Sequence, residues 1–499
     1  MNNVLEWLDN SARSYSSKVA FCDSEGNEIT FKDLNYEIET IGSNLICCLK
    51  KTKSPIMVLT ERNIKSISAF WGVVYSGNFY LPIDASLPEN RINDMIALAK
   101  PIAIINCSDR VFNSNSAKIF NVEELKCCTN KMPRINLIQT DPLYGIFTSG
   151  STGFPKLVLK NHLSIISFVN EYVKTFGFKA EDTQGNQIPF YFDASTKDLF
   201  TTLKVGCTTN IINKSYFSWP GKLANYLVDN QITSICWVPS ALSMLSLFNV
   251  FEKIDLSQIK RVLFVGEPMP TKQLNIWYKA LPKTQFINLY GSTENAGNCL
   301  YYVLNHPLND EERVPIGKEF CNCKVLLLDD NEKLIEKSDT TSIGEICVLG
   351  DILSLGYYQN FEATSEKFCQ NPLNDKYYER MFKTGDVGQY DVDGNIVCLG
   401  RKDYQIKLNG YRIELGDIDV KALTMEGVTS ACSIYDAPKK KIVLYYSGAK
   451  DLGTELVRFL KDKLPSYMVP SKYIYLKAMP LNKNGKIDRN LLKENYFNR

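Results

Sequence analysis

Short apolar runs alternate with stretches of helical periodicity along the first part of the chain. The runs "SPIMVLT", "PIAIINC" and "TTNIINK" have the length and apolar content of buried strands. Between them, "SISAFWGVVYSG" and similar stretches carry apolar residues at helical spacing. Strands of parallel sheets are buried on both faces and are joined by helices. The alternation therefore predicts an α/β fold with layered, largely parallel sheets.

The pattern changes after about residue 320, where "CKVLLLDDNEKLI" and "GEICVLGDILSLGYY" are rich in strand residues and turn signals. The last hundred or so residues return to a mixed pattern, in which "GTELVRFLKDKL" predicts a helix. The segment "GRKD" at 400–403 is a candidate boundary. We therefore expect a large N-terminal domain, 1–402, with layered sheets and a β-rich subdomain, and a small α+β C-terminal domain, 403–499.

Bulk properties exclude several classes of protein. A formal net charge of +2 gives no reason to expect nucleic-acid or membrane-surface binding. The sequence has no apolar run of about 18 residues and no secretory signal at its start, so we expect a cytoplasmic protein. Its 15 cysteines include no pair of CxxC knuckles, which favours reduced thiols over structural zinc. Only two histidines are present, so a histidine-based catalytic triad is not expected.

The stretch "FTSGSTGFPKLVLKNH", 147–162, has the composition of a phosphate-binding loop. Its glycines let main-chain N–H groups approach a phosphate, and its hydroxyls and Lys156 add donors and a positive charge. The rigid nucleotide motif GxxxxGK[ST] is absent, because Lys156 follows a proline and Leu157 follows the lysine. By itself this stretch leaves a flexible surface loop as the alternative.

Further motifs follow in a fixed order: "NLYGSTEN" (288–295), "FKTGDVGQYDVDG" (382–394), "GRKDYQIKLNGYRIEL" (400–415) and "PLNKNGKIDR" (480–489). Together with "SGSTGFPK" they closely resemble the adenylate-forming enzymes, which include acyl-CoA synthetases, luciferases and the adenylation domains of nonribosomal peptide synthetases. The earlier "ITFKDL" and "YSGNFYLPIDASLPENRI" fit as well, so the resemblance covers nearly the whole chain. The segment "YFDAS", 191–195, resembles the branch that activates amino acids.

The resemblance implies a two-step reaction that uses ATP and Mg²⁺. A carboxylate attacks the α-phosphate of ATP to give an acyl-adenylate and pyrophosphate, and the phosphopantetheine thiol of a carrier protein then takes the acyl group. Such transfers need charge neutralisation and alignment more than a nucleophilic side chain. The scarcity of histidine is therefore no obstacle to this chemistry.

The resemblance also implies an ATP site. Its phosphate loop would comprise Thr148, Ser149, Gly150, Ser151, Thr152, Gly153 and Lys156. Leu157 departs from the glycine that the family usually has after this lysine, which affects the exit of the loop but removes no ligand.

Other motif positions would bind the rest of the nucleotide. Thr293 would contact the α-phosphate and Glu294 would hold Mg²⁺, although a lone "TE" would be read as a surface turn. Tyr290 would stack on adenine, and Asn288 would bond its edge. The remaining two positions are on the ribose side, where Asp386 would accept hydrogen bonds from the hydroxyls and Arg401 would assist.

Three positions would serve catalysis and motion. Composition alone makes Lys486 a solvated lysine, but the motif implies that it contacts the substrate carboxylate and the α-phosphate, where charge builds up. Asp403 matches the family's hinge, about which a mobile C-terminal domain would rotate after adenylation. Gly410 would then line the tunnel for the pantetheine arm.

Asp193 matches the residue that binds the substrate's α-amino group, which favours an amino acid over a fatty or aromatic acid. Carried across by position, the substrate pocket comprises Asp193, Ala194, Lys197, Cys236, Leu263, Val265, Leu289, Gly297, Asn298 and Lys486. Lys197 lies four residues after Asp193 on an expected helix, so the two would share a face. Either they form an ion pair without a substrate role, or Lys197 and Asn298 bind the side chain of glutamate or aspartate.

Three alternatives compete with an acidic amino-acid ligase. A D-alanine–carrier-protein ligase is freestanding and of similar length, but that family typically has cysteine where this chain has Val265. An acyl-CoA ligase is disfavoured by Asp193, and a non-catalytic nucleotide-binding protein by the presence of Lys486, Glu294 and Asp386. The sequence contains no carrier "GxxS" module and no HHxxxD motif. We therefore expect a freestanding ligase acting on a carrier protein in trans, with a piece of a larger synthetase as the alternative.

Overall fold

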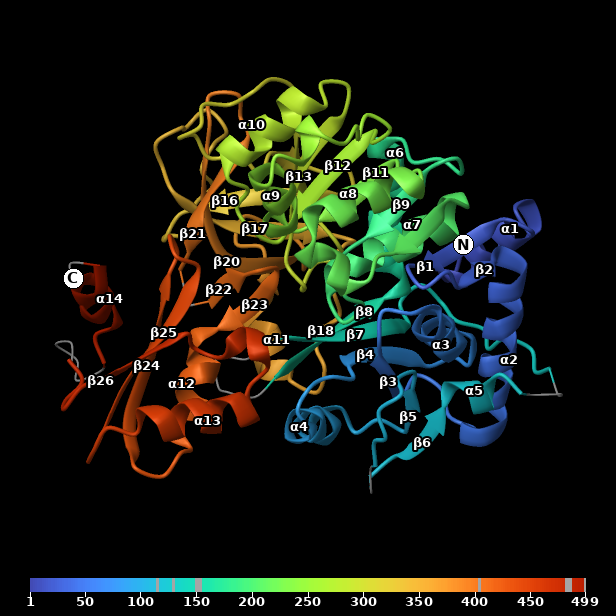
Figure 1. Cartoon of the computed structure of the whole chain (residues 1–499), viewed down its shortest axis with the longest axis horizontal. Coiled ribbons are helices and arrows are strands. Elements are labelled where there is room, and N and C mark those ends of the chain that lie inside the picture. The colour runs from blue at the N-terminus through green and yellow to red at the C-terminus, as the bar shows by residue number, and fades with distance from the viewer. Residues whose placement is uncertain (114–115, 128–130, 149–154, 403–404, 481–486, 498–499) are drawn as a thin grey trace. The chain divides into compact units, whose positions relative to one another are not determined.

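The computed structural model describes residues 1–113, 116–127, 131–148, 155–402, 405–480 and 487–497. The chain divides into two compact units (Figure 1). The first comprises Met1–Ala85, Lys100–Ile146 and Leu157–Lys402, and the second comprises Ser86–Ala99, Phe147–Lys156 and Asp403–Arg499. Because the second unit includes two short segments from the first 402 residues, these units differ from the predicted domains, whose boundary stays a prediction.

A seven-stranded sheet in the first unit has the order β18-β8-β7-β4-β3-β5-β6. β3 pairs in parallel with β4 and β5, and it is buried along its whole length, as the apolar run at 54–60 predicts. β18, at the edge, pairs antiparallel with β8. The strands are β3 (Pro55–Thr60), β4 (Phe79–Asp84), β5 (Ala103–Asn106), β6 (Lys118–Asn121), β7 (Pro142–Thr148), β8 (Lys156–Asn161) and β18 (Gly356–Tyr357).

A nine-stranded sheet in the same unit has the order β15-β14-β13-β12-β11-β9-β10-β1-β2. Its centre, from β13 to β1, is parallel, so the carboxyl ends of these strands meet at one edge. The strands are β1 (Val19–Asp23), β2 (Glu28–Thr30), β9 (Thr183–Asn186), β10 (Thr208–Ile211), β11 (Ser234–Trp237), β12 (Arg261–Val265), β13 (Gln285–Tyr290), β14 (Leu300–Leu304) and β15 (Lys318–Glu319).

Helices pack against these two sheets (Figure 1). In the first unit they are α1 (Leu5–Ser14), α2 (Phe31–Leu49), α3 (Ile64–Tyr75), α5 (Val122–Leu125), α6 (His162–Phe176), α7 (Thr196–Val205), α8 (Pro220–Asp229), α9 (Pro239–Leu247), α10 (Thr271–Ala280) and α11 (Phe361–Lys367). Short 3₁₀ turns occur at Asp193–Ser195, Lys214–Ser218 and Val250–Glu252. Within the described ranges, no helix has both the length and the apolar character that crossing a membrane requires.

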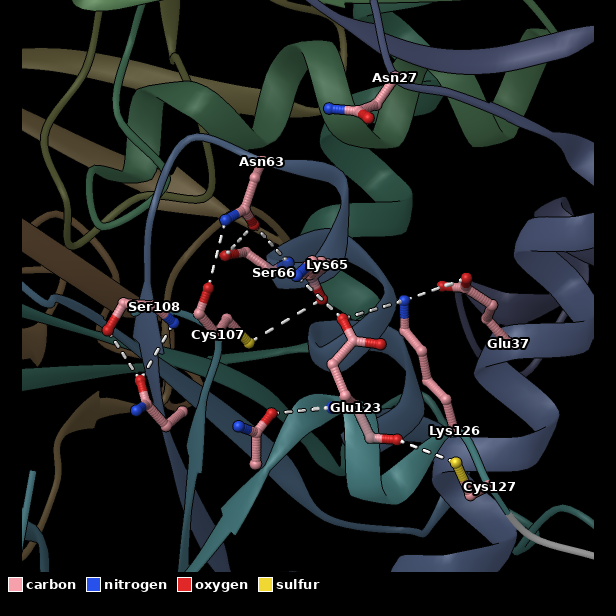
Figure 2. Close-up of polar contacts among 12 residues, drawn as sticks. Asn27, Glu37, Asn63, Lys65, Ser66, Cys107, Ser108, Glu123, Lys126 and Cys127 are labelled. Carbon is pink, nitrogen blue, oxygen red and sulfur yellow. Dashed lines mark hydrogen bonds and ion pairs between the residues drawn. The ribbon is translucent and has the colours of Figure 1, made fainter. Parts of the chain in front are cut away.

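Polar contacts fix the start of α3 and join α5 to α2 (Figure 2). Asn63 caps α3: its Oδ1 accepts from the Ser66 N–H at 3.0 Å, and its Nδ2 donates to the Cys107 carbonyl oxygen at 3.2 Å. Beyond the end of α5, Lys126 Nζ is 3.1 Å from Glu37 Oε1 on α2. These contacts account for the local order of this region, and we assign it no chemical role.

The β-rich part of the first unit is a five-stranded antiparallel sheet, in which β16, β17, β20 and β19 follow one another and β21 pairs with β20. This region follows residue 320, as the change in sequence pattern predicts. Its strands are β16 (Cys323–Leu328), β17 (Gly344–Gly350), β19 (Phe368–Gln370), β20 (Arg380–Tyr390) and β21 (Ile396–Arg401).

The second unit combines a hairpin, a three-stranded sheet and helices. Asn409 (φ 50°) and Gly410 (φ 81°) form the two-residue turn of the hairpin, a position that favours Asn-Gly because both residues need positive φ. α4, α12 and α13 belong to this unit, and Arg91 Nη2 of α4 is 3.2 Å from Asp417 Oδ2 of α12. The elements are α4 (Glu89–Ala99), β22 (Gln405–Leu408), β23 (Tyr411–Glu414), α12 (Leu415–Leu423), β24 (Val428–Asp436), β25 (Lys441–Gly448), α13 (Gly453–Lys463), a 3₁₀ turn at Ser466–Met468, β26 (Lys472–Tyr475) and α14 (Arg489–Phe497).

Candidate active site

Three motif residues from different elements converge around the Asp386 carboxylate. Asp386 on β20 and Arg401 on β21 are register partners, and Arg401 Nη1 lies 2.9 Å from Asp386 Oδ1. The Tyr290 hydroxyl, from the end of β13, donates to Asp386 Oδ2. Burial raises the pKa of Tyr290 above its ordinary value, so this tyrosine stays a hydrogen-bond donor. The cluster therefore holds the Asp386 carboxylate in a fixed position beside a guanidinium group.

Asn288 lies two residues before Tyr290 on the same strand and is also buried. Its Nδ2 donates to the Pro315 carbonyl oxygen at 2.8 Å. This bond fixes the orientation of the Asn288 side-chain amide, with its Nδ2 toward the main chain of Pro315.

Glu294 lies in the turn after β13 and is completely buried. Its Oε1 accepts a hydrogen bond of 2.9 Å from the Tyr357 hydroxyl of β18. Among the described residues, no group of three or more His, Cys, Asp or Glu side chains is arranged to hold a metal ion. Mg²⁺, however, is commonly bound through one or two carboxylates together with substrate phosphates. The single buried carboxylate of Glu294, with the partly exposed Thr293 beside it, fits a site of that kind.

Asp193 is held by two buried side chains from neighbouring strands. The Tyr144 hydroxyl of β7 donates to Asp193 Oδ1 at 2.8 Å. Lys160 Nζ of β8 lies 3.4 Å from Oδ1 and 3.5 Å from Oδ2, and it also donates to the Asn295 carbonyl oxygen. Burial lowers the pKa of Lys160, and the charge of Asp193 opposes that shift.

Lys160 is absent from the residues that sequence reasoning selected. The available signal was a charged residue inside the apolar run "LVLKN" of a buried strand. A lysine at such a position needs a partner, because unpaired buried charges are strongly disfavoured. The sequence does not reveal the partner, since Asp193 lies 33 positions further along the chain.

Lys197, on α7, is 1% exposed. Within the described part of the chain its ammonium group takes part in no hydrogen bond or ion pair, and Asp193 pairs with Lys160 instead. Asp193 occupies a 3₁₀ turn, and α7 begins only at Thr196. With three residues per turn in a 3₁₀ turn, the four-residue offset does not align the two side chains as a continuous α-helix would.

Asp198, the neighbour of Lys197, is buried and accepts a 2.9 Å hydrogen bond from Asn186 Nδ2. Burial raises the pKa of Asp198 to about 7, and the Asn186 hydrogen bond and the Lys197 charge act in the opposite direction. The folded state thus retains a proton that the unfolded chain releases near pH 4.

We expect the free energy of unfolding of the wild-type protein to fall, relative to an Asp198→Asn variant, as the pH rises from about 4 to 7. The slope of this difference is at most about 1.4 kcal/mol per pH unit for one proton. Urea unfolding at several pH values measures it, and Asp229→Asn, at an exposed aspartate of α8, is the control. Parallel pH profiles for the wild type and Asp198→Asn would contradict the assignment.

Four other pocket positions lie on the adjacent parallel strands β11, β12 and β13. Cys236 of β11 is opposite Leu263 of β12, and Val265 of β12 is opposite Leu289 of β13. All four side chains are buried. The two pairings therefore join residues that lie 27 and 24 positions apart in the sequence.

The remaining pocket positions have individual features. Ala194 is partly exposed, in the 3₁₀ turn with Asp193. A Cβ added at Gly297 would lie 2.3 Å from the Phe168 ring, so no larger residue fits there. Asn298 Oδ1 is buried and has no hydrogen-bond partner among the described residues. A ligand that donates a hydrogen bond would satisfy this oxygen.

Several predicted residues lie outside the described part of the chain: Ser149, Gly150, Ser151, Thr152, Gly153, Asp403 and Lys486. At the borders of the phosphate loop, the Thr148 hydroxyl lies 3.5 Å from the Lys156 carbonyl oxygen.

A sequence model of one protein family, described as "AMP-binding enzyme", matches residues 8–358. The chain belongs to the AMP-binding enzyme family. The predicted resemblance to adenylate-forming enzymes is thereby confirmed, as is the prediction that the protein is an enzyme of this class.

Curated relatives of this AMP-binding enzyme include large peptide synthases and carrier-protein ligases. Bacitracin synthase 3 of Bacillus licheniformis is 33% identical over 478 residues, which cover 94% of this chain and 7% of the synthase. The D-alanine--D-alanyl carrier protein ligase of Lactiplantibacillus plantarum is 28% identical over 512 residues, which cover 99% of this chain and 99% of the ligase. The chain thus spans a small part of the large synthases but the whole length of the ligase.

Solved structures confirm the predicted α/β fold class. A nonribosomal peptide synthetase protein containing adenylation and PCP domains matches with a TM-score of 0.85 at 23% identity, covering 99% of this chain and 84% of that one. The o-succinylbenzoate CoA synthetase of Bacillus subtilis matches with a TM-score of 0.86 at 19% identity, covering 99% and 98%. At these identities the likeness concerns the fold alone.

Proposed function

We propose that this AMP-binding enzyme activates an amino acid as aminoacyl-AMP and transfers it to the phosphopantetheine thiol of a carrier protein in trans. In the first step, a substrate carboxylate oxygen attacks the α-phosphorus of ATP, and the bond to the bridging oxygen breaks to release pyrophosphate. In the second step, the carrier thiolate attacks the acyl carbon, and AMP leaves with the electron pair of the acyl–oxygen bond. Family membership supports the use of ATP.

The chain's own residues divide this work. Asp386, held by Arg401 and Tyr290, binds the ribose hydroxyls, while Asn288 and the Tyr290 ring bind adenine. Residues from Thr148 to Lys156 bind the outer phosphates, and Thr293 contacts the α-phosphate. Glu294 holds Mg²⁺, which supplies charge neutralisation to the phosphates when it is bound. Lys486 contributes a positive charge at the reacting carboxylate.

The substrate we favour is an acidic amino acid, glutamate or aspartate. The observation that carries this choice is Lys197, a buried lysine without an ion-pair partner among the described residues. A carboxylate on the substrate side chain would supply that partner. ATP–pyrophosphate exchange with the twenty L-amino acids and several D-amino acids tests it. Exchange that is fastest with a neutral amino acid would reject the acidic preference.

A D-alanine–carrier-protein ligase is the second candidate. It is supported by the end-to-end match to such a ligase from Lactiplantibacillus plantarum. Alanine has no side-chain group to pair with Lys197, and Val265 occupies the position where the D-alanine ligases typically have cysteine. D-alanine as the best substrate in the same panel would establish this candidate instead.

We place the reaction in the cytoplasm, where ATP is available and thiols are reduced. The cysteines of the described ranges are all free, and six of them, among them Cys107, Cys207 and Cys236, are buried. This usage agrees with a reducing compartment.

We expect Asp403→Pro to separate the two half-reactions. Proline fixes φ and would restrict rotation at the proposed hinge between residues 1–402 and 403–499. If the variant is held in the adenylating arrangement, pyrophosphate exchange persists while thioester formation on the carrier falls. Asp403→Ala, which removes the side chain without fixing φ, is the matched control. Equal loss of both half-reactions, or of neither, would argue against a hinge at this position and against the proposed role of Gly410 in the pantetheine tunnel.

A further inference from the structure

Lys160 is a lysine with 0% exposure that lies beside Asp193. It projects from β8, where it follows the apolar residues 157–159, and it contacts the Asp193 carboxylate and the Asn295 carbonyl oxygen. Removing an ammonium group from water costs several kcal/mol, and the chain compensates that cost with the carboxylate of Asp193. Lys160 and Asp193 therefore form an internal ion pair before any substrate binds.

Asp193 is also the carboxylate that the resemblance to adenylate-forming enzymes assigns to the α-ammonium group of the substrate. Its Oδ1 already accepts from the Tyr144 hydroxyl at 2.8 Å, and Lys160 Nζ lies within 3.5 Å of both oxygens. The negative charge at this position is thus compensated by a residue of the chain itself. An α-ammonium group would become the second cation on one buried carboxylate.

Lys160 and Lys197 are both buried, and of the two only Lys160 has an ion-pair partner among the described residues, the Asp193 carboxylate. Two further carboxyl groups, those of Glu294 and Asp198, accept hydrogen bonds from Tyr357 and Asn186. A second substrate carboxylate beside Lys197 would give that ammonium group an ion-pair partner, whereas a substrate α-ammonium group would meet an Asp193 carboxylate that is already paired.

We propose that Lys160 takes the place of a substrate α-ammonium group at Asp193, so that the enzyme activates dicarboxylic acids whether or not they carry an amino group next to the reacting carboxyl. Lys160 is then a specificity-determining residue, and the substrate class widens from acidic amino acids to dicarboxylic acids in general. This inference rests on the proposed adenylating function and on the assignment of Asp193 to the substrate.

The first test compares matched substrates on the unmodified enzyme. ATP–pyrophosphate exchange is measured with L-glutamate and glutarate, and with L-aspartate and succinate, which differ only in the amino group. We expect the two kcat/KM values within each pair to agree within about tenfold. The reason is that the Asp193 carboxylate, which would bind the substrate amino group, is already compensated by Lys160. A loss of more than about a hundredfold on removing the amino group would overturn the inference.

The second test replaces Lys160 with methionine, which keeps the length of the side chain but removes its charge. Asp193 is then left without its cation, and only a substrate with an α-ammonium group supplies one. We expect the preference for glutamate over glutarate to rise by at least about tenfold. An unchanged preference in a folded Lys160→Met protein would overturn the inference.

A double variant guards against loss of folding. Lys160→Met with Asp193→Asn removes both charges, so no buried ion is left unpaired, and circular dichroism and thermal unfolding check that the protein is folded. We expect this variant to lose the preference for glutamate that the single Lys160→Met change creates. Retention of that preference would contradict the role of the pair. Failure of all four acids to support exchange in the wild type would reject the acidic-substrate assignment on which this inference rests, whereas exchange with the two amino acids alone rejects only this inference.

Discussion

Replacing Lys486 with alanine is expected to lower ATP–pyrophosphate exchange by about two orders of magnitude or more. In the proposed reaction this ammonium group lies where negative charge develops between the substrate carboxylate and the α-phosphate. Removing one preorganised charge or donor from such a position typically costs about 10²- to 10³-fold in rate. The measurement is the exchange rate at saturating ATP and amino acid. Near-normal exchange by the variant would reject the assigned role.

The segments that flank this motif indicate that the substitution leaves the fold intact. The Asp488 N–H donates to the Pro480 carbonyl oxygen at 2.8 Å. Arg489 pairs with Asp419 of α12, and its Nε donates to Cys432 Sγ at 3.2 Å. None of these bonds involves the Lys486 side chain. Lys493→Ala, at an exposed lysine of α14, is the matched control and should leave exchange unchanged.

The layered fold could be predicted because its signals are local. The apolar run at 54–60 forms β3, and the run "RVLFV" followed by "TKQLNIWYKA" forms β12 and α10. Runs of this kind specify buried strands and helices wherever they stand, since the pattern of burial matches the geometry of the element. The Asn-Gly turn at Asn409 and Gly410 was equally readable, because few residue pairs tolerate its backbone angles.

The site was only partly predictable, because its decisive contacts are not local. Tyr290 and Asp386 lie 96 positions apart, and they were placed together by motif resemblance and not by any pattern in the residues. The Lys160–Asp193 pair matches no motif, and periodicity describes Lys160 only as an anomaly in a buried strand. The spacing of Lys197 from Asp193 was interpreted as one α-helical face, but the chain forms a 3₁₀ turn there. The roles of the predicted residues stay predictions until the variants are measured.

Replacing Lys197 with methionine is expected to change substrate preference more than any other pocket substitution. Lys197 is 1% exposed, and among the described residues its ammonium group has no hydrogen-bond or ion-pair partner. A neutral substrate would leave it uncompensated, whereas a side-chain carboxylate gives it a charge-assisted hydrogen bond. We expect the transition-state stabilisation that kcat/KM measures for the best acidic substrate to fall by about 2–5 kcal/mol. This is the usual range for truncating one member of a buried charge pair. Substrates with neutral side chains of similar length should gain in kcat/KM relative to the acidic substrate.

Lys204→Met is the matched control, because Lys204 is a partly exposed lysine near the end of the same helix, over the Trp7 ring. It should leave the ranking of substrates unchanged. If L- or D-alanine were the best substrate of the unmodified enzyme, the acidic assignment would be wrong. The aliphatic stem of Lys197 would then serve to narrow the pocket.

The effects of Lys160 and Lys197 can be distinguished by the pairs of substrates that are compared. Lys197→Met should alter the ratio of acidic to neutral side chains, whereas Lys160→Met should alter the ratio of acids with and without an α-amino group. A single variant that moved both ratios equally would mean that the two charges act as one unit.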